Sequence, residues 1–278
     1  MNKRSFFISA ISIMLAFGTN ASAQNFPPMG APGQQGPAVQ TRPMGAPGMP
    51  GAPVAPAGAP QQGGFMRQAT TFAKTDITPY FTPSTKKVAT PDAEGFIRRW
   101  TLLEPIAKPN RSNTVFTDSY LRAEFAKPYF QNQMTIIPKD GDMVTVEGKE
   151  LKWHCLDSKL YNVKLFRFAT SLAENAERYG ILCWAVTVVN CDQDIENVRL
   201  AVGSNSASMW WLNGEEAVIL SGDRRMVADD ATSKRLTLKK GKNVIRGVVI
   251  NGPGMSDFCV RFLDEKGQPV KNITITNE

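Results

Sequence analysis

Aromatic, arginine and aspartate side chains gather between residues 210 and 230. A guanidinium and a carboxylate are planar groups that bond pairs of neighbouring hydroxyls, and an aromatic ring offers an apolar face. Adjacent residues of a strand point to opposite faces, so we expect Trp210 to point inward with Leu212 and Trp211 to point outward. This combination suits a polyhydroxyl ligand, and the candidate carbohydrate-binding residues are Trp211, Arg224, Arg225, Asp229, Asp223 and Trp210.

The same charged loop admits two other interpretations. Arg224 and Arg225 lie between aspartates, so an internal Arg–Asp network would satisfy these charges without a ligand. Two carboxyl groups about 5–9.5 Å apart would instead suit glycoside hydrolysis, with Asp223, Asp229 and Asp230 as the candidates. Acidic loop residues are more often solvated or turn-capping, so we assign no catalytic residue here.

The single histidine, His154, limits the chemistry further. It excludes a site with two or more histidine ligands, and any serine or cysteine triad would have to use it. Asp157 and Ser158 lie nearby in sequence, but neighbours on a strand point to opposite faces. No Gly-x-Ser-x-Gly elbow is present, because residues 203–207 lack the final glycine. We expect His154 to be a packed or rim residue.

Composition and charge exclude several classes of protein. Of 278 residues, 42% are hydrophobic and 21% are charged, as in an ordinary globular protein. The net charge is +7, and the densest basic run, residues 239–242, fits a turn between strands. No broad basic face is indicated, so we expect no nucleic-acid partner. Charges interrupt every apolar stretch after residue 18, so no membrane span is predicted. No cofactor or metal site is predicted.

The four cysteines permit three pairings. Cys183 and Cys191 lie eight residues apart along one expected strand and its exit, or about 26 Å in extended chain. A disulfide needs Cα atoms within about 7 Å, so Cys183 would pair with Cys155 or Cys259 if it pairs at all. The favoured interpretation is that all four are small buried apolar residues.

The first 95 residues divide into three segments. Residues 1–23 combine Lys3 and Arg4 with an apolar run at 6–18 and Ala-Ser-Ala at 21–23, as in a signal peptide cleaved before Gln24. Residues 24–69 contain ten prolines between positions 27 and 60 and predict a disordered spacer. Residues 70–95 form a lead-in, and residues 96–278 form the folded domain.

Short strands dominate the folded part. We expect strands at 96–103, 143–147, 161–168, 181–189, 198–202, 208–212, 217–220, 235–238, 243–250 and 258–263, and a short helix at 118–125. Asn213-Gly214 predicts a two-residue hairpin, because both positions tolerate positive φ. Strands at intervals of about ten residues, with few helices, predict an all-β sandwich.

Four motifs in this order resemble the galactose-binding-like β-sandwich (jelly-roll) modules of secreted bacterial proteins. The motifs are WTLLEPI at 100–106, GSNSASMWWLNG at 203–214, LKKGKNV at 238–244, and the strand 258–262 with its turn DEKGQP at 264–269. The match covers roughly residues 96–270. Where the family often carries two acidic residues, this chain has Asn205 and Ser206, which are weaker ligands for a hard cation, so metal binding is not carried over.

The resemblance implies a function, since such modules are often attached to glycoside hydrolases and acetyl-xylan-esterase-type proteins. The leading hypothesis is an exported, non-catalytic carbohydrate-binding or accessory module that contacts polysaccharide. One alternative is an envelope scaffold that holds other proteins, partly through the Pro-rich spacer. Another is a carbohydrate esterase or glycoside hydrolase. We expect a periplasmic, cell-surface or extracellular location in a Gram-negative bacterium.

Overall fold

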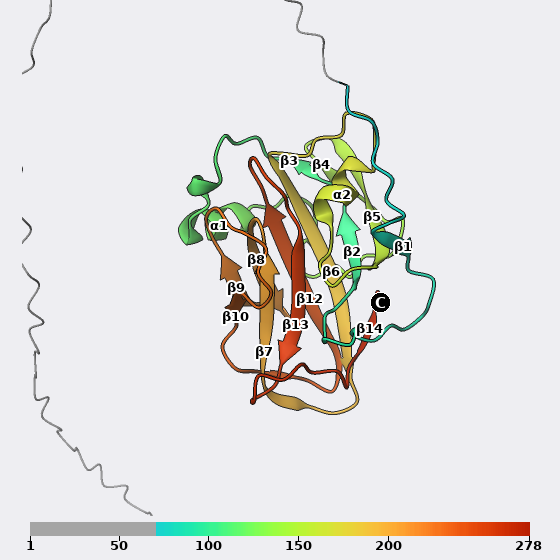
Figure 1. Ribbon diagram of the computed structural model, residues 1–278, viewed down its shortest axis with the longest axis vertical. Helices are drawn as coiled ribbons and strands as arrows, with labels where there is room; N and C mark the ends of the chain where they lie inside the picture. The colour runs from blue at the N-terminus through green and yellow to red at the C-terminus, as the bar shows by residue number, and fades with distance from the viewer. Residues whose placement is uncertain (1–70) are drawn as a thin grey trace, which may run out of the picture. The chain divides into compact units, whose positions relative to one another are not determined.

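The computed structural model describes residues 71–278 (Figure 1). The expected signal peptide at 1–23 and spacer at 24–69 lie outside the described residues. Within the described part, strands dominate and there are only two α-helices, so the all-β prediction is confirmed. The lead-in segment is part of this fold, since β1 (Phe81–Pro83) pairs with a strand of the main sheet and Ala89 bridges to Ile275.

The larger sheet is antiparallel throughout. Its order is β1, β5 (Lys149–Ser158), β2 (Arg99–Leu103), β6 (Ile181–Cys191), β12 (Gly241–Ile250), β8 (Ala207–Leu212) and β9 (Glu215–Leu220). The short strands β3 (Ile106–Ala107) and β14 (Thr274–Thr276) also pair with β6, and β4 (Met143–Val146) pairs with β5. The long central pair, β6 and β12, therefore organises this sheet.

The smaller sheet is built around β7 (Ile195–Ser204). It pairs with β13 (Phe258–Leu263), β10 (Ala231–Thr232) and β11 (Leu236–Leu238), all antiparallel. Figure 1 shows β7 and β13 in front of β6 and β12. Apolar residues of both sheets form one buried core between them, and the domain is therefore a β-sandwich.

The inner core is centred on an aromatic cluster. Trp100, Trp210 and Phe258 have ring centroids 4.9–5.8 Å apart, within the range at which aromatic pairs attract. The Trp210 ring lies directly on Gly247 of β12, where an added Cβ would fall 2.2 Å from a ring carbon. Glycine is needed at this position because the indole occupies the space that any side chain would take.

A second, outer core lies on the opposite face of the larger sheet. It is covered by residues 104–142, which include a 3-10 turn (Asn113–Val115) and α1 (Asp118–Phe125). Thr117 caps α1 by accepting a hydrogen bond from the Tyr120 amide at 3.3 Å, and Leu121 and Phe125, four residues apart on one face of the helix, are buried against the sheet. The sheet is thus buried on both faces, which explains why residues 181–189 are apolar apart from Thr187.

A buried carboxylate holds this covering segment together. Glu124 of α1 accepts hydrogen bonds from Lys127 at 2.7 Å and from the Tyr129 hydroxyl, and Lys108 lies 2.5 Å away. Burial by itself raises the pKa of Glu124, but these hydrogen bonds outweigh it and bring the pKa to about 2. The side chain is therefore ionised and fully paired at neutral pH.

Most expected elements are present, and one is wrong. The helix at 118–125 is confirmed as α1, and Asn213 and Gly214 have φ of 52° and 89°, as a type I′ hairpin requires. The strand expected at 161–168 is absent: Val163 makes one bridge to Phe258, and the chain then forms α2 (Leu165–Thr170). Four of the six residues of α2 are apolar and buried, and they do not alternate with polar residues. A buried helix and a buried strand share this pattern, so the sequence could not distinguish them.

All four cysteines are buried and unpaired. The favoured interpretation of them as small apolar residues is confirmed, and Cys183 makes no bond to Cys155 or Cys259. Burial alone raises the pKa of Cys183 to about 12, so this thiol stays protonated and unreactive at neutral pH.

Candidate functional site

The two adjacent tryptophans point to opposite faces of β8, but both are buried. Trp210 is fully buried in the inner core, and Trp211 is only 7% exposed in the outer core. Trp211 stacks on Trp184 at 6.3 Å with the rings 10° from parallel, and Phe125 of α1 packs edge-on against it. The expectation that Trp211 is exposed is wrong, because residues 104–142 cover this face. Neither indole is available to a ligand.

Four of the five charged side chains of the 221–230 loop are bonded within the protein. Arg224 forms an ion pair with Asp230 and donates to the Ser221 carbonyl at 3.1 Å. Asp229 pairs with Arg261 of β13, and Asp223 accepts a hydrogen bond from Asn113 at 2.8 Å. This is the internal Arg–Asp network that the sequence left open. The expected sugar-binding residues are not brought together as one site, and Arg225 is simply exposed.

His154 takes no part in a triad with its sequence neighbours. Its Nε2 lies 3.0 Å from Glu104 Oε1, and its ring packs edge-on against Phe168. Asp157 instead pairs with Arg99, and the Ser158 hydroxyl donates to the Leu160 carbonyl at 2.8 Å. Among the described residues, no serine or cysteine side chain forms a hydrogen bond with His154.

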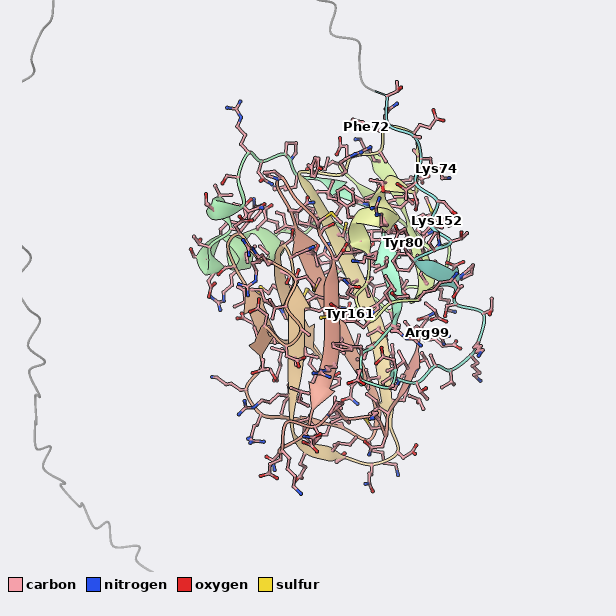
Figure 2. All side chains as sticks on the ribbon, viewed as in Figure 1. Phe72, Lys74, Tyr80, Arg99, Lys152 and Tyr161 are labelled. Carbon is pink, nitrogen blue, oxygen red and sulfur yellow. The ribbon has the colours of Figure 1, made fainter. Side chains whose placement is uncertain are left out.

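An exposed aromatic ring lies instead beside the smaller sheet. Tyr161 is 43% exposed and packs against Phe96, with centroids 5.1 Å apart. The guanidinium of Arg261 lies over the same Phe96 ring at 4.6 Å, and Asp229 binds this guanidinium. We name these four residues the Tyr161 surface. Figure 2 shows Tyr161 in front of the ribbon, by the strands of the smaller sheet.

Hydrogen bonds fix the orientation of the polar pair in the Tyr161 surface. Arg261 Nε donates to Asp229 Oδ1 at 2.9 Å, Nη2 donates to Oδ2, and Nη1 donates to the Glu94 carbonyl at 2.7 Å. The bond to Asp229 raises the pKa of Arg261. The two side chains keep 17% and 22% of their area exposed. Their outer edges can therefore donate to and accept from hydroxyl groups while the pair stays intact.

The sequence identifies only Asp229 of this surface. Tyr161 was assigned to a strand that does not form. Arg261 is the single charged residue in the apolar strand 258–263, and strand alternation places it opposite Val260 and Phe262. That alternation predicts an outward-facing arginine. It does not predict the contacts of Arg261 with Phe96 and Asp229, which lie about 165 and 32 residues away in sequence.

A polar groove of about 770 Å³ lies along the edge of the sandwich, between β9 and β11. Its lining includes the Arg122–Glu216 ion pair, with Nη2 and Oε1 2.7 Å apart. Leu212, Ala217 and Leu236 provide its apolar part. No tryptophan, tyrosine or phenylalanine lines it, so it does not combine an aromatic face with polar groups as the Tyr161 surface does.

The loop between β7 and β8 is held by the loop before β13. The Asn205 amide donates to the Asp257 carbonyl at 3.2 Å, and the Ser206 hydroxyl donates to the Met255 carbonyl at 2.6 Å. Across residues 71–278, no group of three or more histidine, cysteine, aspartate or glutamate side chains is arranged to hold a metal ion. None of the helices described is both long and apolar enough to cross a membrane.

Comparisons with known proteins return only distant likenesses. No family model matches the chain, and no curated protein matches it. Among solved structures, the PA14 domain of MpAFP antifreeze protein is 11% identical, with 69% of this chain and 96% of that one covered and a TM-score of 0.34. Two structures of the β-glucosidase from Kluyveromyces marxianus are similar too. The selenomethionine-labelled form is 17% identical over 48% of this chain, with a TM-score of 0.33, and the glucose complex is 18% identical over 33%, with a TM-score of 0.21.

The chain matches 16% and 11% of the length of these two β-glucosidase structures. At these identities and TM-scores the likenesses assign no family and no ligand, and the fold rests on the strand order described above.

Proposed function

We propose that this chain is a non-catalytic carbohydrate-binding module of the galactose-binding-like type, and that the Tyr161 surface contacts the glycan. The observation that carries the proposal is that an exposed tyrosine ring and an oriented Arg–Asp pair both pack against the ring of Phe96. The motif order in residues 96–270 supports the galactose-binding-like assignment. Export through the signal peptide at 1–23, to the periplasm, cell surface or medium, belongs to the same proposal.

The tyrosine provides the apolar part of the contact. Its ring is supported from one side by Phe96, which is itself buried. A ring held in this way loses little conformational freedom when a ligand stacks on it, and a tyrosine has few rotatable bonds to fix. Covering it removes apolar area from water, at about 25 cal/mol per Å².

The Arg261–Asp229 pair provides the polar part. Each group is fixed by the other before any ligand arrives, so binding does not require them to be ordered anew. Their charges are paired without a ligand, which avoids leaving a partly buried charge unsatisfied. The exposed N–H and carboxylate edges can then bond adjacent hydroxyls of one sugar ring.

The same geometry supports a binding role over hydrolysis. Both oxygens of Asp229 accept hydrogen bonds from Arg261, so this carboxylate is occupied. Of the other two carboxylates that the sequence offers for catalysis, Asp230 pairs with Arg224, and Asp223 accepts a hydrogen bond from Asn113. A glycosidase needs one free carboxylic acid and one free carboxylate flanking the scissile bond, whereas each of these three groups is bonded to another side chain.

Titration calorimetry of the full chain against soluble plant and host polysaccharides tests the proposal. For any glycan that the parent chain binds, we expect Tyr161→Ala to raise the dissociation constant about tenfold, which corresponds to about 1.4 kcal/mol of binding free energy. Tyr179→Ala is the matched control, because Tyr179 is also exposed, at 53%, and also packs on a phenylalanine, Phe166. Absence of binding across the panel, or equal losses in both variants, would contradict the proposal.

A further inference from the structure

Two adjacent hollows open beside the segment of residues 84–87, away from the Tyr161 surface residues. Their volumes are about 320 and about 540 Å³, and Thr85, Lys86 and Arg99 line both. We name them together the Arg99 hollows. They lie near β1, β2 and β5 and the C-terminal residues 277–278. Figure 2 shows Arg99 at the side of the domain that carries β1 and β14 in Figure 1.

Arg99 is a buried and firmly oriented cation. Its side chain is 1% exposed, and Asp157 binds it through two parallel bonds of 2.8 and 2.9 Å. Nη1 donates a third bond to the Lys86 carbonyl at 2.7 Å. A guanidinium has five N–H groups. One N–H on each terminal nitrogen therefore has no acceptor among the described residues, although the group is buried.

Basic groups outnumber acidic ones around Arg99. The lining contains five cationic side chains, Lys86, Lys87, Arg98, Arg99 and Lys139, and three carboxylates, Asp140, Asp157 and Glu278. Asp157 is neutralised by Arg99, and Asp140 Oδ1 accepts a hydrogen bond from the Cys155 amide at 2.8 Å. None of the other four cations forms an ion pair within residues 71–278.

We propose that the Arg99 hollows bind an oxyanion, namely the carboxylate or sulfate groups of an acidic polymer or a free inorganic anion of the same chemistry. Arg99 lines both hollows and has two N–H groups left to donate, and charge-assisted bonds from a guanidinium to an oxyanion are short and strong. Lys86 and Lys139 are exposed lining residues and add positive charge. The site is separate from the Tyr161 surface, and it adds recognition of an anionic group to whatever that surface binds.

Sulfate and polygalacturonate are the two probes, and they separate the two sources of the anion. The full chain is titrated with sodium sulfate at constant ionic strength, while the Arg99 Nε–Hε signal is followed by NMR. Polygalacturonate is titrated separately by calorimetry. We expect a saturable shift of the Arg99 signal with sulfate, and binding of the polymer if the natural ligand is a polyanion.

Two double variants with equal loss of charge decide the location. Lys86→Gln with Lys139→Gln removes two cations from the hollows and should weaken anion binding by about tenfold or more. Lys74→Gln with Lys266→Gln is the control, since both residues are exposed and neither lines the hollows. Both pairs avoid Arg99, whose loss would leave Asp157 unpaired and risk unfolding.

The outcomes are distinct. Saturable binding of either probe that only the Lys86/Lys139 variant weakens supports the site. Equal weakening in both double variants would show general charge attraction and overturn it, as would the absence of any response to both probes. Tyr161→Ala should leave sulfate binding unchanged, so this inference and the proposed glycan function fail independently.

Discussion

The two cores of this domain share one sheet but are closed in different ways. The inner core lies between two regular sheets, where strands present alternate residues to each other. The outer core lies between the larger sheet and residues 104–142, a segment with one short helix. β8 contributes Trp210 to the first and Trp211 to the second. The sheet that covers the inner core is held in shape by strand pairing. The irregular segment that covers the outer core depends instead on particular polar contacts.

Those polar contacts differ sharply between the two cores. Main-chain ladders such as β6–β12 and β7–β13 position the inner core. Glu124 with Lys108, Lys127 and Tyr129 ties the cover of the outer core together within itself. Side-chain bonds attach the cover to the rest of the domain, among them those from Arg246 to the Ile136 carbonyl at 2.6 Å and from Asn110 to the Asn251 carbonyl at 2.9 Å. We therefore expect the outer core to be the weaker and the more pH-sensitive of the two.

Removing each tryptophan tests this difference most directly. Trp210→Ala should lower the free energy of unfolding by about 4 kcal/mol, because a cavity between two sheets cannot collapse. Trp211→Ala should cost less, about 3 kcal/mol, because the cover can settle into the space. Urea denaturation measures both. An equal or reversed order would show that the cover is as rigid as the second sheet.

The contact between Trp210 and Gly247 gives the next largest effect. Gly247→Ala places a methyl group against the indole and should destabilise the protein by about 3 kcal/mol through overpacking. In a Trp210→Phe background the smaller ring leaves more room, so the same substitution should cost clearly less. A double-mutant cycle by urea denaturation measures the coupling, and additive costs would contradict the packing argument.

Acid should loosen the outer core before the inner one. The pKa of Glu124 is lowered from 4.5 to about 2, so its contribution is present above pH 4.5 and is lost as the pH falls through about 2. We expect about 3 kcal/mol from this group at neutral pH. The protection factors of the α1 amides, which correct for the intrinsic exchange rate at each pH, should fall between pH 4.5 and 2, ahead of those in β6 and β12.

Glu124→Gln is the companion variant for the acid experiment. It keeps the shape of the side chain but cannot titrate, so the pH dependence of exchange in α1 should flatten in that window. Its free energy of unfolding at neutral pH should fall by about the same 3 kcal/mol. An unchanged acid profile would show that another group governs the cover.

The inner core was largely predictable from the sequence, and the outer core was not. The apolar run at 181–189, the Asn213-Gly214 turn and the strands at 243–250 and 258–263 are local patterns with a fixed period, and each forms as expected. The helix at 118–125 was also found. The sequence did not predict which residues this helix covers. Phe125 packs on Trp211, and the two lie in distant segments that no periodic pattern relates.

The candidate site shows the same limit. Asp229 was named for its residue type, but its partner Arg261 lies 32 residues later, and the exposed ring is Tyr161 and not Trp211. Alternation predicted that Trp210 and Trp211 face opposite ways, and they do. Alternation could not predict that a non-strand segment covers the second face, because exposure depends on what lies above a residue.

The stacked pair of Trp184 and Trp211 gives the protein an optical signature. Two nearly parallel indoles 6.3 Å apart couple their electronic transitions, so the pair should add an exciton band to the circular dichroism spectrum. All five tryptophans are at most 7% exposed, and their emission should therefore be blue-shifted. Lifting the cover would abolish the exciton band while Trp100 and Trp210 kept their blue emission. The two signals together would therefore serve as an intrinsic spectroscopic probe for the state in which only the outer core is open.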